Sequence, residues 1–206
     1  VLINSTGSAT YNNAVMAYRQ LDDERPGHKL KVRFVDSRTY SMTFGWYVCE
    51  AARKIRNGAE VSMVQKELEQ VFARDEVCLA AFSLKQMKKS GRISAAAAFA
   101  GELLGLRPII SLNDGVSSVK SKVRGDAAVI PAMIKYVKSR VENVQELEYQ
   151  LAYTDGERIN ELVKQCKKEF GHPPVNVFQL GCVVSANTGP DALAITFLGQ
   201  DRGPRA

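Results

Sequence analysis

Three short segments combine hydroxyl, amide and glycine residues in a way that suits anion binding. The first, residues 4–11, reads NSTGSATY and lies between a short apolar run and a helical pattern. Free N–H groups at a helix start, the helix dipole and the hydroxyls of Ser8 and Thr10 suit a carboxylate or a phosphate. The alternative is that Ser8 or Thr10 only caps the helix. The segment lacks the Gly-Lys-Ser/Thr sequence of a phosphate loop, so it supports nucleotide binding weakly.

The second and third segments offer further groups for an anion. Residues 90–94 read SGRIS and place Arg92 just before an alanine-rich pattern. The planar guanidinium of arginine suits carboxylate recognition. Residues 184–190 read VSANTGP, where Asn187 and Thr188 can each donate a hydrogen bond. A surface arginine on a turn and an ordinary Asn/Thr/Gly loop are the plainer alternatives, and spacing alone does not decide between them.

No catalytic or metal-binding set emerges from the sequence. His28 and His172 lie outside the three segments, so a Ser-His-Asp or Cys-His arrangement has no candidate. The loop carboxylates Asp36, Asp155 and Asp191 have the positions of caps and turn residues rather than of a metal pair. None of the four cysteines forms a C-x-x-C pair. We therefore expect no catalytic residue, no metal and no cofactor.

Composition indicates a globular protein without a nucleic-acid site. The 206 residues are 45% hydrophobic and 24% charged, which supports a real core. The net charge of +6 is spread along the chain, and we interpret its one tight basic group (Lys85, Lys88, Lys89 and Arg92) as a solvated helix face. No apolar run approaches the ~20 residues of a membrane span, and there is no signal peptide. Free cysteines in apolar runs fit a reducing cytosol, so we expect a cytoplasmic protein.

The first part of the chain alternates helical and strand patterns. Apolar spacing predicts helices over residues 12–21, 44–56 and 61–73, while residues 30–35 alternate apolar and basic side chains and predict a strand. This alternation is typical of an α/β layer with parallel strands. The chain begins inside an apolar run, without a start methionine, so we expect a fragment whose first domain is incomplete.

The second part has the pattern of an α+β unit. The sequence NDG at 113–115, between two apolar runs, predicts a β-hairpin. A charged boundary near Arg74 and Asp75 divides the chain into residues 1–75, the end of a first α/β domain, and residues 76–206, a second domain with a mixed or antiparallel sheet flanked by helices. The predicted strands are 76–82, 108–112, 116–122, 147–153, 175–181 and 192–198, and the predicted helices are 84–89, 95–106, 126–141 and 157–170.

Six segments, in order and over nearly the whole chain, resemble the DegV family of bacterial fatty-acid-binding proteins. TYNNA after Ser8 resembles the family's L-S-G-T-Y-Q-S-A, and VDSR followed by SM resembles V-D-S-R…S-M. LKQMKKSGRIS resembles L-x-x-L-x-x-G-G-R-I-S, and GELLGLRPII resembles G-x-L-L-x-I-K-P-I-L. KVR resembles part of V-R-T-R, and NTGPDAL resembles H-T-G-P-G-A-L. Single segments are weak signals, but six in the right order are specific.

The resemblance implies a two-domain DegV-like α/β fold that closes on a fatty acid. A hydroxyl of the first domain and an arginine and a histidine of the second would hold the carboxylate. These roles fall on Ser8, Arg92 and Asn187, beside Thr188. The family's other hydroxyl belongs to an upstream T-S-x-P-S segment that this chain lacks. Asparagine replaces the histidine, and it can donate a hydrogen bond but does not titrate near neutral pH.

The acyl chain would lie in a buried tunnel, where each CH₂ contributes about 0.8 kcal/mol. Family members act as the acyl-carrying subunit of a fatty-acid kinase whose separate ATP-binding subunit phosphorylates the carboxylate. We therefore expect a lipid-binding subunit, not an enzyme. Arg124, with the basic stretch at Lys85, Lys88 and Lys89, would dock the kinase subunit. A general lipid chaperone without a kinase partner, and an enzyme with a phosphate or nucleotide site at residues 4–10, are the alternatives. The expected tunnel residues, each of which could instead be plain core, are Phe44, Phe99, Leu103, Leu104, Leu106 and Ile109.

Overall fold

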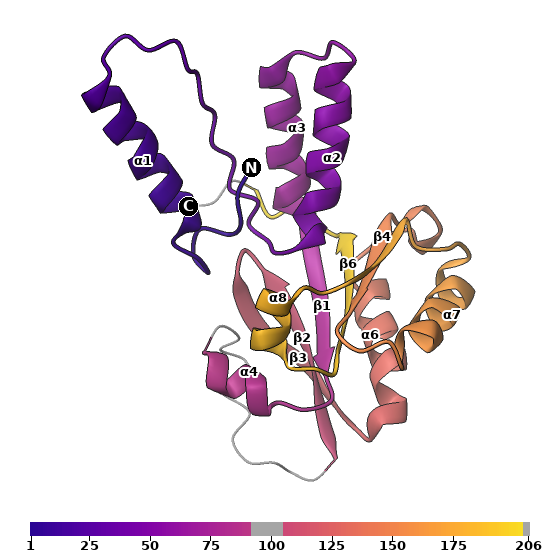
Figure 1. Ribbon diagram of the computed structural model, residues 1–206. Coiled ribbons are helices and arrows are strands. Elements are labelled where there is room, and N and C mark those ends of the chain that lie inside the picture. The colour runs from indigo at the N-terminus through magenta and orange to yellow at the C-terminus, as the bar shows by residue number, and fades with distance from the viewer. Residues whose placement is uncertain (92–104, 204–206) are drawn as a thin grey trace. The chain divides into compact units, whose positions relative to one another are not determined.

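The computed structural model describes residues 1–91 and 105–203 as two compact units (Figure 1). The first unit comprises Val1–Ala73 with Gly203, and the second comprises Arg74–Arg202. The predicted helix at 95–106 falls almost wholly outside the described residues, and Leu106 begins a strand instead. Each unit is described separately below.

The first unit contains three helices, as predicted: α1 (Thr10–Glu24), α2 (Met42–Arg56) and α3 (Val61–Arg74). In α3 the residues Val64, Leu68 and Phe72 are buried, at the four-residue spacing that aligns side chains along one helix face. They pack with Val35 and residues of α2 in one apolar cluster. The helix α1 has no buried residue, so its amphipathic pattern is not matched by a core beneath it.

The strand predicted at residues 30–35 is wrong. The described residues of the first unit contain only one isolated parallel bridge, between Leu2 and Asp36. Leu30 and Val32 are exposed, although Val35 is buried. A strand needs a neighbour along its whole length, and here only the residues around Leu2 pair with this segment. The parallel sheet expected for the first part is therefore reduced to this bridge within the described chain.

The second unit is built on a six-stranded mixed sheet in the order β3-β2-β1-β6-β4-β5 (Figure 1). All neighbouring strands are antiparallel except β4 and β5, which are parallel. The last strand in sequence, β6, therefore lies between β1 and β4. The strands are β1 (Asp75–Ala81), β2 (Leu106–Asn113), β3 (Val116–Arg124), β4 (Tyr149–Tyr153), β5 (Asn176–Gln179) and β6 (Ala192–Leu198).

The predicted hairpin joins β2 to β3 and shows why its turn residues matter. Asp114 and Gly115 both have positive φ, 53° and 80°, as a two-residue turn of the primed type requires. The carboxylate of Asp114 also accepts hydrogen bonds from the guanidinium of Arg202 at 3.1 and 3.3 Å. The turn is thus fixed both by backbone conformation and by an ion pair.

Helices cover both faces of this sheet (Figure 1). On one face, α6 (Val129–Lys138), preceded by the 3-10 turn Asp126–Ala128, and α7 (Ile159–Phe170) enclose the larger apolar core. On the other face, α4 (Lys85–Ser90) and α8 (Cys182–Thr188) cover a smaller cluster. Pro131 lies in the first turn of α6, where its missing N–H breaks no helical hydrogen bond.

The ordinary loop that the sequence left open as an alternative at 184–190 does not occur, because α8 (Cys182–Thr188) occupies most of this segment. Side chains that favour loops bond back onto the helix here. The Nδ2 of Asn187 donates to the carbonyl oxygen of Val183 (2.7 Å), and the hydroxyl of Thr188 donates to that of Val184 (3.2 Å). Gly189, with φ of 94°, then ends the helix.

Candidate functional site

The loop that carries Ser8 is held by the buried side chain of Asn4. This residue is fully buried, and its Nδ2 donates to the carbonyl oxygen of Arg38 (2.8 Å). Its Oδ1 accepts from the backbone N–H of Thr6 (2.8 Å) and from the Thr6 hydroxyl (2.7 Å). An amide that serves both as donor and as acceptor fixes the turn of the chain directly before Ser8.

A second anchor for this loop is Asp36. Its Oδ1 accepts from the backbone N–H groups of Ser5 (3.2 Å) and Arg38 (2.9 Å), and its Oδ2 accepts from the Ser5 hydroxyl. Gly7 lies so close to the hydroxyl of Tyr40 that any Cβ there would collide with it. The segment VDSR and the residues after it therefore act as the support of the Ser8 loop.

Ser8 lies two residues before the first residue of α1 and is partly exposed. Its Oγ accepts from the backbone N–H of Thr10 (3.3 Å) and shares a hydrogen bond with the Thr10 hydroxyl (2.8 Å). The Ser8 and Thr10 hydroxyls have one hydrogen each, and the hydrogen bond between them uses only one of these two hydrogens. One hydrogen remains for an anion at the start of α1, so capping and anion binding are compatible here.

In the second unit, α4 and α8 pack side by side. The Nε2 of Gln86 donates to the carbonyl oxygen of Ala186 (2.6 Å), and a Cβ at Gly189 would lie only 3.4 Å from the Cβ of Gln86. These contacts bring the described end of the SGRIS segment, at Ser90 and Gly91, onto the same face of the sheet as residues 184–190.

The two donors expected on α8 are partly occupied. Thr188 is buried, and its single hydroxyl hydrogen is directed to backbone carbonyl oxygens at 3.2 and 3.3 Å. Asn187 is partly exposed and uses one of its two amide hydrogens for Val183, which leaves one for a ligand. Of this pair, Asn187 is the residue better able to donate to an anion.

The other predicted site residues are distributed as follows. Arg92, Phe99, Leu103 and Leu104 lie outside the described residues. Ser8 belongs to the first unit, whereas Asn187 and Thr188 belong to the second, so the carboxylate-binding set stays a prediction.

Three predicted tunnel residues are described. Phe44 packs beside the apolar cluster of α2 and α3, and Leu106 is partly buried at the start of β2. Ile109 is fully buried in the core beneath α6 and α7, while its neighbour Ile110 faces the cluster under α4 and α8. Ile109 is therefore core, and Ile110 is the β2 residue on the face shared by the two polar segments.

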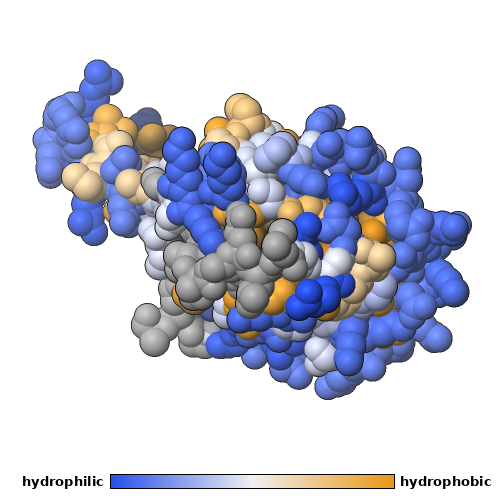
Figure 2. All heavy atoms as spheres, turned by 90° about the horizontal axis from the view of Figure 1, so that it is seen from below, coloured by the Kyte–Doolittle hydropathy of each residue, from blue (hydrophilic) through white to orange (hydrophobic). Residues whose placement is uncertain are grey.

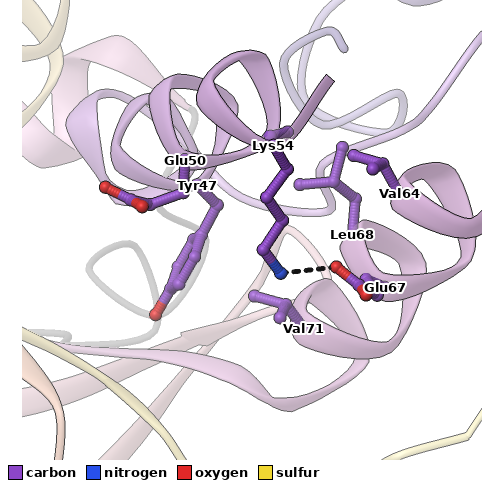
Figure 3. A pocket seen from close by; sticks show the side chains of 8 residues that line it. Tyr47, Glu50, Lys54, Val64, Glu67, Leu68 and Val71 are labelled. Carbon is purple, nitrogen blue, oxygen red and sulfur yellow. Dashed lines mark hydrogen bonds and ion pairs between the residues drawn. The ribbon is translucent and has the colours of Figure 1, made fainter. Parts of the chain in front are cut away.

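A small cavity lies between α2 and α3 (Figure 3). Its volume is about 50 Å³, and an ion pair between Lys54 and Glu67 (2.6 Å) crosses its mouth. Pockets for ligands the size of drugs are ~300–1,000 Å³, so this cavity is too small for a long acyl chain. Its apolar floor is formed by Ala51, Val64, Leu68 and Val71.

Sequence reasoning missed a buried ion pair at the start of β1. Glu76 is fully buried and accepts from Nη2 (2.6 Å) and Nε of Arg140, and also from the hydroxyl of Tyr136 (3.2 Å). Burial, followed by the charge of Glu76, raises the pKa of Tyr136 to about 12. Gly199 packs against the carboxylate with no room for a Cβ. A glutamate inside the apolar run 75–82 was the available signal.

A second charged network lies at the end of β1 and the start of β6. The guanidinium of Arg158 bonds Asp191 (2.8 Å) and Asp126 (3.2 Å) and lies 4.1 Å from the ring centre of Phe82. Asp126 also pairs with Arg107 (2.9 Å). Burial raises the pKa of Asp191, and the charge of Arg158 opposes that rise only in part. These contacts link the end of β1, the start of β6 and the turn before α6.

The surface of the described residues is mostly polar. Figure 2 shows hydrophilic residues over most of the face, with apolar residues visible between them. Arg124 is exposed at the end of β3 and makes no ion pair within residues 1–91 and 105–203. Among those same residues, no helix combines the length and apolar character that crossing a bilayer requires, and no group of three metal-ligating side chains occurs.

Comparison with known proteins gives one consistent family. A family model described as "Uncharacterised protein, DegV family" matches residues 1–200. A DegV domain-containing protein of Caldanaerobacter subterraneus is 29% identical over 198 residues, covering 96% of this chain and 69% of that protein.

Solved structures agree with this match. A DegV family protein from Thermus thermophilus, described by its fatty acid binding, has a TM-score of 0.77 at 25% identity, covering 96% of this chain and 69% of that one. A stearic-acid-binding protein from Eubacterium ventriosum has a TM-score of 0.82 at 20% identity, covering 96% and 68%. At that lower identity the likeness shows the fold alone.

Proposed function

The chain belongs to the DegV family, and from this premise we propose that it binds a long-chain fatty acid and presents the carboxylate to a separate kinase subunit. The observation that carries the proposal is the fold shared with the Thermus thermophilus protein over nearly the whole chain. The anchored Ser8 loop at the start of α1 supports it from within this chain. A hydroxyl with a hydrogen to spare beside a helix N-terminus is suited to a carboxylate.

The proposed carboxylate-binding residues are Ser8, Arg92 and Asn187, and Thr188 supports Asn187 from beside it. Ser8 donates a hydroxyl hydrogen, and Arg92 supplies the positive charge that makes the hydrogen bond strong. Asn187 donates the amide hydrogen that its own helix leaves unused. Thr188 contributes as the buried support of this turn, because its hydroxyl hydrogen is already directed to the backbone.

The acyl chain is proposed to lie in an apolar tunnel. Phe44, Phe99, Leu103, Leu104 and Leu106 are retained as lining residues, and Ile109 is assigned to the core on the grounds given above. Tight binding follows from burial alone, since each CH₂ adds about 0.8 kcal/mol.

Native mass spectrometry of the protein as purified tests the ligand. The expected result is a non-covalent adduct with the mass of a long-chain fatty acid. A ligand-free protein that also fails to take up added fatty acid in calorimetry would contradict the proposal.

The carboxylate set is tested by calorimetry on Ser8→Ala and Arg92→Ala. Hydrogen bonds to a charged group contribute ~1.5–3 kcal/mol, so each variant should bind at least about tenfold more weakly. Ser121→Ala, on the exposed edge of β3, is the matched control and should bind as the parent does. Unchanged affinity in both variants would remove the assignment.

The proposal of a kinase partner rests on the resemblance to the family, and Arg124 is the proposed docking residue. Purified ATP-binding subunit of a bacterial fatty-acid kinase should form acyl phosphate from the bound fatty acid, and Arg124→Ala should slow this without changing fatty-acid affinity. Binding without phosphorylation would favour a general lipid chaperone. Affinity of the isolated chain for ATP would favour the nucleotide-binding enzyme instead.

A further inference from the structure

The start of α2 has an unusual backbone. Ser41, directly before the first residue of this 15-residue helix, has φ of 60° and ψ of −151°. Residues other than glycine rarely adopt this conformation, and they keep it only where the surroundings impose it. The Ser41 side chain does not cap the helix, although serine is among the preferred capping residues. The hydroxyl is therefore not used by its own helix.

A buried hydroxyl without a partner lies two residues earlier. Thr39 is 4% exposed, and its Oγ1 has no hydrogen-bond partner. The backbone of the same residue is satisfied, since its carbonyl oxygen accepts from the backbone N–H of Asn4 (3.1 Å) and from the Ser37 hydroxyl (3.2 Å). Most buried hydroxyls are bonded to protein atoms or to ordered water, so an orphaned one calls for an explanation such as an ion. The orphaned Oγ1 thus indicates a missing hydrogen-bond partner, and an acceptor would satisfy its O–H.

The start of α2, which follows Thr39 within a few residues, also offers donors. The first N–H groups of α2 have no partner inside the helix, and the helix dipole makes this end positive. The first turn contains no acidic side chain that could serve them. Thr43, in the same turn, is buried at 3% exposure and carries a hydroxyl that can donate. Unserved backbone N–H groups beside hydroxyls that can donate, with no acidic side chain in the first turn, favour an anion.

This segment borders the Ser8 loop within the first unit. The backbone hydrogen bond from Asn4 to Thr39 joins the two, and Gly7 contacts Tyr40. The partial exposure of Ser41 gives a small anion a route to the helix start.

We propose that Thr39, Ser41 and Thr43, with the first N–H groups of α2, form an oxyanion-binding subsite for a carboxylate or phosphate group. The subsite is distinct from Ser8, Arg92 and Asn187, and it goes beyond the proposed function because it requires neither an acyl chain nor the second unit. A bound oxyanion supplies the acceptor that the Thr39 hydroxyl lacks.

The test uses Thr39→Val, which removes the hydroxyl and keeps the shape of the side chain. The full chain is titrated with acetate and, separately, with inorganic phosphate, while the backbone amide signals of Thr43 and Phe44 are followed by NMR. The parent should show saturable shifts, and Thr39→Val should weaken the binding about tenfold or more. Without added anion, the variant should have a higher melting temperature, because an unpaired buried polar group has been removed.

Two control variants make the result specific. Thr196 on β6 is also buried, at 2% exposure, with an orphaned hydroxyl. Thr196→Val should raise the melting temperature in the same way and leave anion affinity unchanged. Thr39→Ser retains a hydroxyl and should retain most of the affinity.

The outcomes separate this subsite from the proposed function. Saturable acetate or phosphate binding that depends on Thr39, with no uptake of long-chain fatty acid, supports the subsite and contradicts the proposed function. A preference for acetate over phosphate assigns the subsite to a carboxylate, and the reverse assigns it to a phosphate. Amide shifts that are absent in the parent, or equal in the parent and Thr39→Val, overturn the subsite.

Discussion

At the scale of single residues, buried polar groups fall into two kinds in this chain. Glu76 and Asn4 are fully buried, and both have hydrogen-bond partners: Arg140 for Glu76, and Arg38 and Thr6 for Asn4. Thr39 and Thr196 are equally buried and keep an orphaned hydroxyl. Buried polar groups with partners fix the fold. A buried hydroxyl without a partner lowers the free energy of unfolding by its desolvation penalty, which a bound ligand can remove. This contrast is invisible in sequence, because it depends on neighbours that are far apart in the chain.

The pair formed by Glu76 and Arg140 should be essential for stability. Arg140→Ala leaves the carboxylate buried without its cation, which costs ~3–5 kcal/mol for a fully buried pair; we expect about 3 kcal/mol because Arg140 is partly exposed. Urea unfolding measures the change. Lys138→Ala, which breaks the exposed pair with Glu169, is the control and should cost below ~1 kcal/mol. Equal losses in the two variants would contradict the assignment.

Asp191 should make stability depend on pH in the less common direction. Its raised pKa means that the folded state holds the proton more tightly than the unfolded state. Its contribution is therefore fully present below about pH 4, the ordinary range of an aspartate, and is lost as the pH rises through the higher folded value.

Asp191→Asn should flatten this part of the pH profile and raise the free energy of unfolding at neutral pH. The amide oxygen can still accept from Arg158, so the hydrogen bond to the guanidinium is retained. Chemical denaturation between about pH 3 and 7 checks the result. A variant profile parallel to that of the parent would contradict it.

At the scale of elements, local pattern and long-range pairing had different predictive value. Residues 61–73 and the hairpin at 113–115 were predicted correctly, because helix periodicity and turn chemistry are local signals. Residues 30–35 carry a strand pattern but lack a neighbouring strand. The position of Ser8 before a helix could be predicted, whereas the support by Asn4 and Asp36 could not, because it joins segments about thirty residues apart.

The β2–β3 turn gives a prediction at this scale. Gly115 has φ of 80°, a conformation in which a Cβ is strained, so Gly115→Ala should destabilise the protein by about 1 kcal/mol. Gly156→Ala is the control, since Gly156 has no positive φ and open space around it. Thermal unfolding compares the two. Equal melting temperatures would show that the turn tolerates a side chain.

At the scale of the whole chain, the two units differ in how much apolar surface they bury. The second unit encloses two apolar clusters around a complete sheet, whereas the first has one small cluster and a helix, α1, without any buried residue. Protection of backbone amides depends on such burial and on cooperative packing. The units should therefore open with different free energies.

Hydrogen exchange should show this difference directly. Amides of α1 should exchange far faster than those of β1 and β6, which pair along their full lengths. Mass spectrometry of peptides from residues 10–24 and 192–198 measures both in one experiment. Comparable protection in the two peptides would contradict this prediction, because it would mean that α1 is packed against other parts of the protein.

The central place of β6 also determines when the second unit can fold during synthesis. The strands β1, β2 and β3 can pair as soon as they leave the ribosome, and so can the parallel strands β4 and β5. The strand that joins these two groups is made last, so until then each presents an unpaired edge. Until β6 is synthesised, the nascent second unit is therefore only partly folded and prone to association. A chain truncated before Ala192 contains two groups of strands that are not joined into one sheet.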